Sequence, residues 1–91
     1  MYYLYILLCD RAFFYVGVTR KLGERVADHK VGRSPHTKRY RLVEHLYTEE
    51  YPTRNEAEKR EKQIKGWSKE EKKALISGNI EKLRELSKNK S

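Results

Sequence analysis

The sequence predicts a small α/β fold of the α+β type: a three-stranded antiparallel sheet flanked by helices, in the order ββαβα followed by C-terminal helices. Two runs rich in aromatic and β-branched residues lie within residues 3–19 on either side of a polar tetrapeptide, which is typical of a β-hairpin. Two later segments open with a Ser/Thr-x-x-Glu signal and continue with apolar residues at helical spacing. A further apolar segment, residues 40–51, predicts the third strand.

The length and charge of the chain limit what it can do. Its 91 residues allow one domain, 1–91, and a chain of this size buries only about 60–65% of its unfolded surface. We therefore expect a shallow surface site rather than an enclosed cavity. The 21 Lys and Arg residues exceed the 13 Asp and Glu residues, for a formal net charge of +8. This balance favours a polyanionic partner such as nucleic acid, the alternative being a lysine-rich protein without one.

Cysteine content and hydropathy indicate the compartment. The single cysteine, Cys9, excludes an internal disulfide and a cysteine-based zinc cluster. The apolar run at residues 2–8 lacks a basic n-region and is too short to span a membrane. We therefore expect no membrane association and a cytoplasmic location.

The predicted hairpin turns at residues 9–12. This register places Leu8 near Phe13, and Tyr5 opposite or beside Tyr15, so that two phenol groups lie side by side across an antiparallel pair. Gly17 follows, where the missing side chain leaves room for the close approach of a backbone or a phosphate.

A helix follows, with Thr19 as its predicted N-cap and Gly32 as its stop signal. Arg25 and His29 are four residues apart and therefore project from one stripe of this helix. They face either the tyrosines of the hairpin or the solvent.

Residues 32–39 form a turn-rich basic loop that can contact phosphates, or else serves as an ordinary solvated connection. The strand that follows, residues 40–51, places Leu42 and Leu46 on one face and Val43 and Tyr47 on the other. Apolar residues on both faces predict a position at the centre of the sheet.

The next helix begins with the capping box Thr53-x-x-Glu56 and has Ala57 and Ile64 on its apolar face. Glu61 lies inside that stripe. Burial of a lone carboxylate costs several kcal/mol, which is comparable to the stability of a whole domain. A cation, a metal ion or water should therefore compensate Glu61, unless its side chain reaches solvent at the edge of the stripe.

The C-terminal part predicts packing helices. Ser68-x-x-Glu71 is a second capping box, and Gly78 ends its helix. Asn79 can cap a last helix, after which residues 87–91 form a basic tail.

Residues of the predicted hairpin, of the helix after it and of the helix that begins after Thr53 also resemble those of a known family. Tyr3-Leu4-Tyr5 and Tyr15-Val16-Gly17 resemble the paired tripeptides of the GIY-YIG nucleases, with Tyr3 in place of the first glycine, as in small stand-alone bacterial and archaeal members. The spacing of Leu22, Arg25 and His29 is similar to the family's L-x-x-R-x-x-x-H helix. Residues 56–65 resemble its E-A-x-x-x-E-x-x-I-K segment. The resemblance covers about residues 1–76, and residues 77–91 are the C-terminal helix and tail.

The resemblance implies a Mg²⁺-dependent endonuclease with the catalytic residues Tyr5, Tyr15, Arg25, His29 and Glu61. Glu61 is then the ligand of one Mg²⁺ or Mn²⁺ ion, since magnesium keeps most of its waters and needs few protein ligands. Arg25 suits the non-bridging phosphate oxygens. At ordinary pKa values of about 6.5 and 10, His29 is a better base at pH 7 than a phenol. The resemblance favours a tyrosine, and the choice among Tyr5, Tyr15 and His29 stays open.

We expect DNA as the partner, with single-stranded, branched or damaged DNA as the preferred substrate, as in DNA repair, and with a protein partner as one source of specificity. The predicted nucleic-acid contacts are Gly17, Thr19, Lys30, Arg33, His36, Thr37, Lys38 and Arg39. The alternatives are a non-catalytic nucleic-acid-binding module and an RNA-directed nuclease. A binding module has no need of an inward Glu61, which favours the enzyme.

Overall fold

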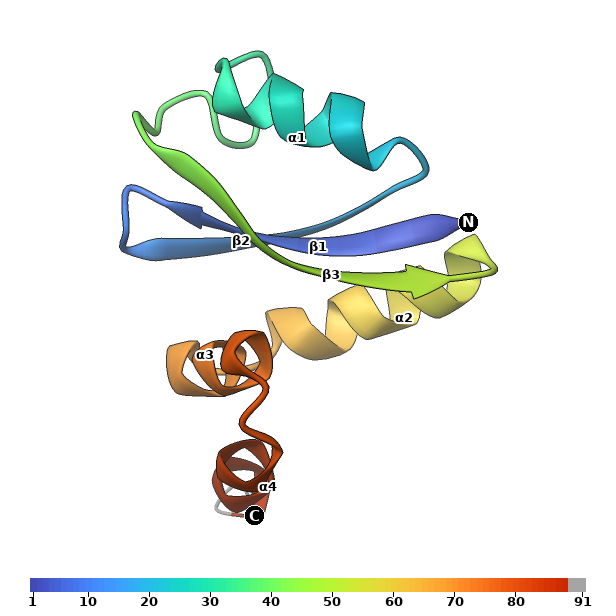
Figure 1. The fold of residues 1–91 in the computed structure, drawn as a ribbon, viewed down its shortest axis with the longest axis vertical. Helices are drawn as coiled ribbons and strands as arrows, with labels where there is room; N and C mark the ends of the chain where they lie inside the picture. Colours follow the sequence, from blue (N-terminus) through green and yellow to red (C-terminus); the bar gives the residue numbers. More distant parts are fainter. Residues whose placement is uncertain (89–91) are drawn as a thin grey trace.

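A computed structural model describes residues 1–88 as one sheet with helices on both faces (Figure 1). The elements are β1 (Tyr2–Cys9), β2 (Phe13–Thr19), α1 (Leu22–Lys30), β3 (Val43–Tyr51), α2 (Arg54–Lys65), α3 (Lys69–Ser77) and α4 (Ile80–Lys88). Both neighbouring strand pairs are antiparallel. The predicted fold class and the order of the elements are confirmed.

The hairpin turn occupies residues 10–12, with Cys9 paired to Phe13. Asp10 and Arg11 have φ values of 51° and 56°, in the left-handed region that tight turns use. Leu8 therefore pairs with Phe14, one residue away from the predicted partner.

Tyr5 pairs with Gly17, and Leu7 pairs with Tyr15. Because residues two apart on a strand share a face, Tyr5 and Tyr15 are diagonal neighbours on the same face of the sheet. The predicted side-by-side placement of the two phenols is confirmed.

The third strand lies at an edge of the sheet, so its predicted central position was wrong. The strand order is β2-β1-β3, with β1 in the middle. The register shifts between Ile6, which pairs with Tyr47, and Leu7, which pairs with His45, so Leu46 is an extra residue at a bulge. Its side chain is 38% exposed. Val43 packs in the core on the α1 side and Tyr47 against the core on the α2 side, so β3 is covered on both faces although it is an edge strand.

The side chains on the two faces of β1 belong to two different hydrophobic cores. Leu4 and Ile6 join the core on the α2 side, which includes Ile64. Tyr5 and Leu7 join the core on the opposite side, against which the α1 residues Leu22 and Val26 pack. Figure 1 shows α1 and α2 on opposite sides of the sheet. The alternation of side chains along β1 therefore places Tyr5 under α1.

The helix ends agree with the local signals, with two exceptions. Ser68 and Glu71 form the predicted capping box, and the Thr53 side chain accepts a hydrogen bond from the Glu56 amide. Thr19 does not cap α1: it is the last residue of β2, and its hydroxyl accepts a hydrogen bond from the Lys21 amide at 3.1 Å. The predicted tail is helical at its start, since α4 runs to Lys88, and residues 89–91 lie outside the described part of the chain.

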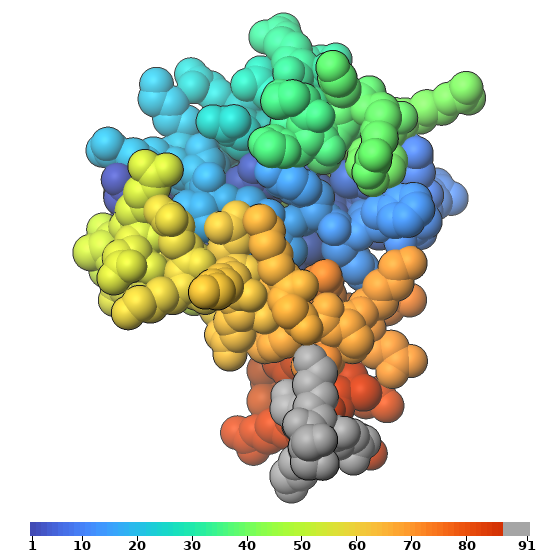
Figure 2. Space-filling view, turned by 180° about the vertical axis from the view of Figure 1, so that it is seen from behind, coloured from blue at the N-terminus to red at the C-terminus, as the bar shows by residue number. Residues whose placement is uncertain are grey.

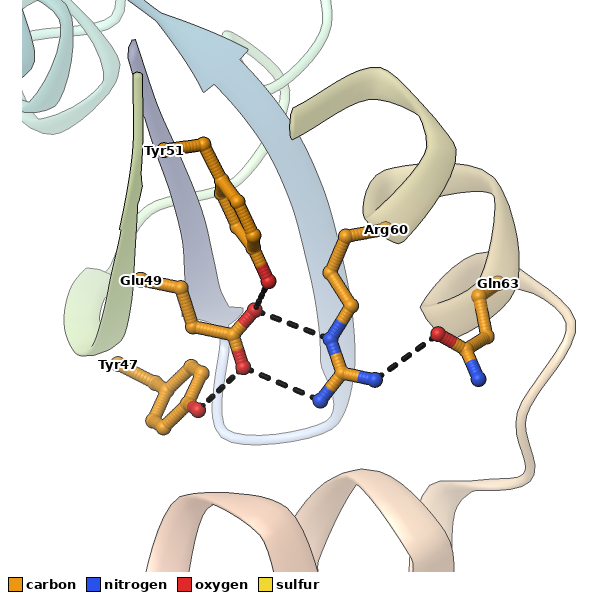
Figure 3. Close-up of polar contacts among 5 residues, drawn as sticks. All are labelled: Tyr47, Glu49, Tyr51, Arg60 and Gln63. Atoms are coloured by element: carbon orange, nitrogen blue, oxygen red, sulfur yellow. Dashed lines mark hydrogen bonds and ion pairs between the residues drawn. The ribbon is translucent and has the colours of Figure 1, made fainter. Parts of the chain in front are cut away.

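An ion-pair network joins β3 to α2 (Figure 3). Arg60 donates from Nε and Nη2 to the two Glu49 carboxylate oxygens at 3.0 and 3.1 Å. Tyr47 and Tyr51 donate their hydroxyls to the same carboxylate at 2.5 and 2.6 Å. Burial acts to raise the pKa of Glu49, but the hydrogen bonds from Arg60 and the two tyrosines prevail and lower it. This network fixes α2 against the sheet.

Candidate catalytic site and nucleic-acid interface

The space above Gly17 is filled by the ring of Tyr5. A Cβ atom at Gly17 would lie 2.5 Å from the Tyr5 hydroxyl oxygen and 2.6 Å from Cζ, closer than carbon atoms approach in proteins. Glycine is thus required here to seat the phenol. We predicted that a phosphate could approach Gly17, but the phenol occupies that position, so Gly17 is a packing residue of the site.

Tyr5, His29 and Thr37 form a buried hydrogen-bonded chain. The Tyr5 hydroxyl lies 3.0 Å from His29 Nε2, and His29 Nδ1 lies 2.6 Å from Thr37 Oγ1. All three residues are at most 2% exposed. Thr37 therefore orients the imidazole, and its burial does not support the direct nucleic-acid contact that we predicted for it.

Burial keeps the two central groups neutral at pH 7. It is the largest cause that raises the pKa of Tyr5 above its ordinary value, followed by the neighbouring Tyr15. Burial also lowers the pKa of His29 below its ordinary value, followed by the positive charge of Arg25 and by His36. A neutral imidazole therefore faces a neutral phenol. When His29 Nδ1–H donates to Thr37, Nε2 is free to accept the Tyr5 proton.

Tyr15 lies over this pair and toward the surface. Its ring centroid is 6.2 Å from that of Tyr5 and 5.0 Å from that of His29. The exposed His36 from the loop after α1 stacks on Tyr15 at 5.7 Å and 28°. The half-buried phenol of Tyr15 thus lies between the buried chain and the solvent.

Arg25 lies one helical turn before His29 on α1 and is exposed. Its positive charge opposes the burial that raises the pKa of Tyr5 and adds to the burial that lowers the pKa of His29, so the guanidinium is within electrostatic range of both. Arg25 also lines a hollow of about 300 Å³ at the end of β2, together with Thr19 and Arg20. Thr19 is 8% exposed, so it offers little surface to a nucleic acid. Its hydroxyl also already accepts a hydrogen bond from a backbone amide.

Glu61 extends from α2 at the edge of the apolar face. Its side chain is 23% exposed and pairs with Lys65 Nζ at 3.3 Å. The carboxylate is thus compensated by a lysine cation and by solvent, in agreement with the expectation that a charge in this stripe needs compensation. Its negative charge still contributes to the raised pKa of Tyr5, so Glu61 lies within electrostatic range of the buried chain.

The donor set fits one hydrated magnesium ion. Across residues 1–88, no group of three or more His, Cys, Asp or Glu side chains could hold a metal ion. A cage built only from protein ligands is therefore not available among these residues. Mg²⁺ does not need one, because it is commonly bound by one or two carboxylates with waters and substrate phosphates as further ligands. The partly exposed Glu61 meets this requirement.

The remaining predicted nucleic-acid contacts are on the surface. Lys30, Arg33, Lys38 and Arg39 are all exposed. Arg33 lies 3.7 Å from Asp28, an ion pair whose partners are both accessible to solvent. All four charged groups are thus accessible to a polyanion.

Sequence patterns did not indicate how His29 is held. Thr37 is eight residues beyond His29 and across a turn, so no helical or strand periodicity relates them. The stacking of His36 on Tyr15 is likewise set by the course of the loop. A buried imidazole needs a partner for each nitrogen, but the sequence does not identify which nearby hydroxyl provides it.

The surface over this site is formed by the edge strand. Figure 2 shows residues of β2 as a blue band between α1 and its following loop on one side and α2 and α3 on the other. Because β2 is an edge strand, no other strand among residues 1–88 covers this band. The site is therefore shallow and open, as we predicted from the length of the chain.

Comparison with known proteins identifies the family. The model of the GIY-YIG catalytic domain matches residues 1–74. The chain belongs to the GIY-YIG family. The match covers both tripeptides, α1 and α2, so the GIY-YIG fold of the nuclease type extends through every candidate catalytic residue.

Relatives of this GIY-YIG chain include bacterial proteins that carry the name UPF0213. A UPF0213 protein of Staphylococcus saprophyticus is 36% identical over 77 residues, which cover 84% of this chain and 94% of that protein. A UPF0213 protein of Staphylococcus epidermidis is 36% identical over 76 residues, which cover 82% and 93%. The solution NMR structure of a UPF0213 protein from Bacillus halodurans has a TM-score of 0.55 and 29% identity, and the match covers 85% of this chain and 84% of that one. These names state no activity.

Within residues 1–88, no helix is both long enough and apolar enough to cross a membrane. The cytoplasmic location stays a prediction.

Proposed function

We propose that this GIY-YIG protein is a metal-dependent DNA endonuclease that hydrolyses phosphodiester bonds with one divalent ion. The observation that carries the proposal is the buried Tyr5–His29–Thr37 chain under Tyr15. A binding module has no use for a phenol and an imidazole that are held together away from solvent. Arg25 and Glu61 within electrostatic range supply the charges that phosphoryl chemistry needs.

Phosphate recognition falls to Arg25. Its guanidinium is permanently charged and planar, so it can donate two parallel hydrogen bonds to two non-bridging oxygens of the scissile phosphate. The hollow beside it gives the strand room to approach. The same charge stabilises the additional negative charge that the phosphate develops during attack.

The proton of the attacking water passes through a relay. A phenol at its ordinary pKa is a poor base at pH 7, by about 4 kcal/mol, and burial makes Tyr5 poorer still. The Tyr5 oxygen accepts the proton of the water as its own proton moves to Nε2 of the neutral His29. Tyr15, nearer the surface, positions the water or a phosphate oxygen. In the proposed relay the imidazole is the final proton acceptor, and Tyr5 passes the proton to it.

Glu61 would hold the Mg²⁺ or Mn²⁺ ion, which when bound supplies charge stabilisation for the leaving oxygen. The carboxylate must exchange Lys65 for the metal, and its partial exposure permits this exchange.

The preferred substrate is DNA with unpaired bases. The open edge of the sheet and the exposed basic side chains form a shallow surface that can bind the phosphates of a DNA strand. This surface is not shaped to enter a groove of duplex DNA. Branched or damaged repair intermediates present such strands. An RNA substrate or a purely binding role are the alternatives, and a partner protein can add specificity.

The deciding experiment uses single-stranded, duplex and branched DNA with Mg²⁺, with Mn²⁺ and with a chelator. We expect cleavage that requires the metal and that falls by several orders of magnitude in Glu61→Gln. Glu58→Gln on the same helix, where Glu58 pairs with the exposed Arg54, is the matched control and should cleave normally. Wild-type cleavage by Glu61→Gln would contradict the single-metal proposal and leave the binding module as the better account.

A further inference from the structure

An aromatic pair lies beyond the proposed catalytic residues. Phe13, the first residue of β2, is 53% exposed. Its ring centroid is 5.7 Å from that of Tyr40, with 35° between the planes. Tyr40 comes from the loop before β3 and is half-buried. Two tilted rings therefore present apolar surface at the turn end of the hairpin.

A cation lies over each ring. Lys69 Nζ, at the start of α3, is 5.6 Å from the Phe13 centroid. The guanidinium carbon of Arg39 is 5.0 Å from the Tyr40 centroid, and Arg39 also donates to the Tyr40 hydroxyl at 2.9 Å. Asp10, the acidic residue of the adjacent turn, accepts hydrogen bonds from the amides of Arg41 and Leu42. The aromatic surface is thus bordered by two exposed positive charges.

Phe13, Tyr40, Arg39 and Lys69 are together called the platform. The platform lies next to the proposed catalytic residues, further along β2. Phe13 and Tyr15 are two residues apart on one strand, so they share a face and are about 7 Å apart. Figure 1 shows the hairpin turn, the loop before β3 and α3 on the same, left-hand side of the view. A strand that passes Tyr15 along β2 therefore reaches the platform next.

We propose that this platform is a stacking site for an unpaired nucleobase of the DNA strand, next to the scissile phosphate. Bases stack on aromatic side chains irrespective of sequence, and Arg39 and Lys69 lie where flanking phosphates would pass. A base inside a duplex is already stacked and cannot enter. A second copy of this chain is a poor occupant, because a net charge of +8 on each copy repels the other. The inference rests on the proposed nucleic-acid substrate and adds the subsite that reads strandedness.

Binding is measured by fluorescence anisotropy on the full chain, with labelled single-stranded oligonucleotides and without metal. Phe13→Ala should weaken binding about 5- to 100-fold, as expected for the loss of one stacked base. Phe13→Leu, which keeps an apolar side chain, should weaken it similarly, and Phe13→Trp should retain it. Leu46→Ala removes another exposed apolar side chain, at the bulge of β3, and should bind normally.

An abasic scan identifies the contact. A single abasic position moved along the oligonucleotide should weaken wild-type binding at one place, and Phe13→Ala should be insensitive to the gap at that same place. Equal losses for wild type and Phe13→Ala at every position would overturn the platform. A dimer in sedimentation that Phe13→Ala dissociates would also overturn it, in favour of a self-association surface.

The scan separates this inference from the proposed function. Metal-dependent cleavage without the position-specific loss leaves the endonuclease in place and removes the platform. No binding of any DNA removes both. Thermal unfolding of Phe13→Leu close to that of the wild type excludes misfolding as the cause of weaker binding.

Discussion

At the scale of single residues, the site depends on two contacts that hold Tyr5 and His29 in place. Gly17 seats the Tyr5 ring, and Thr37 occupies the second nitrogen of His29. Neither residue performs chemistry in the proposed reaction. Both fix where the groups that do perform it are held.

Gly17→Ala should lower activity much more than stability. The added methyl group meets the Tyr5 ring at 2.5 Å, so the buried phenol must shift away from His29. Overpacking of this kind costs about 1–3 kcal/mol, which chemical denaturation measures. Gly23→Ala is the control, because nothing lies within 4 Å of a Cβ at that helical position. It should be neutral or stabilising by up to about 1 kcal/mol. An active Gly17→Ala would mean that the Tyr5–His29 contact is dispensable.

Thr37→Val should disturb the imidazole without changing the size of the side chain. Nδ1 of His29 then loses its only hydrogen-bonding partner in the structure described, at a cost of about 1–3 kcal/mol. Thr37→Ser keeps the hydroxyl and should behave as wild type. The measurement is the pH–rate profile together with urea unfolding. Identical profiles for Val and Ser would contradict an orienting role for Thr37.

The pH dependence of stability should carry the signature of His29. Its pKa is lowered in the folded chain, so the unfolded chain binds more protons and stability rises with pH through this window. The contribution is present above the unfolded pKa of about 6.5 and is lost as the pH falls toward the folded value. Urea unfolding between pH 7 and pH 5 should show this decline, and His29→Gln should flatten it. A wild-type curve that rises on acidification over this range would contradict it.

At the scale of elements, the orientation of α2 rests on the Glu49–Arg60 network. Glu49 on β3 and Arg60 on α2 are 16% and 23% exposed and share two hydrogen bonds. Glu61 is the next residue along α2, so the network also fixes where the proposed metal ligand lies. The ion pair and the site residue Glu61 are therefore coupled through α2, which carries both Arg60 and Glu61.

Arg60→Met should destabilise the fold by about 2–3 kcal/mol, because it leaves a half-buried carboxylate without its cation. Arg54→Met breaks the exposed pair with Glu58 and should cost less than about 1 kcal/mol. Urea unfolding of both variants measures the difference. The double variant Glu49→Leu with Arg60→Met should be more stable than Arg60→Met alone. Strictly additive losses in this cycle would show that the two residues do not interact.

Local patterns predicted the elements well and their long-range partners poorly. The hairpin, the capping box at Ser68 and the αL residue Gly78 follow from neighbouring residues alone. The edge position of β3 does not, because a bulge that brings Leu46 to the surface depends on pairing with β1. Glu49 and Arg60 are eleven residues apart and lie on different elements, so no periodicity relates them.

At the scale of the whole molecule, the excess of positive charge should act as an unspecific phosphate track. The three exposed cations Arg33, Lys38 and Arg39 lie on the loop that also supplies His36 and Thr37. Changing all three to alanine should flatten the salt dependence of DNA affinity by up to about three counterions. The triple variant of Lys73, Lys82 and Arg84, on α3 and α4, removes the same charge elsewhere. Equal slopes for the two triple variants would mean that the loop holds no phosphate.

The contact between Tyr5 and Gly17 also has an evolutionary consequence. Because the phenol lies on the glycine, the two positions can change only together. A descendant that gains a side chain at position 17 must shrink the one at position 5, and it then loses the hydroxyl that bonds His29. Covariation of this pair across the family should therefore mark lineages that have abandoned catalysis and kept the scaffold for another use.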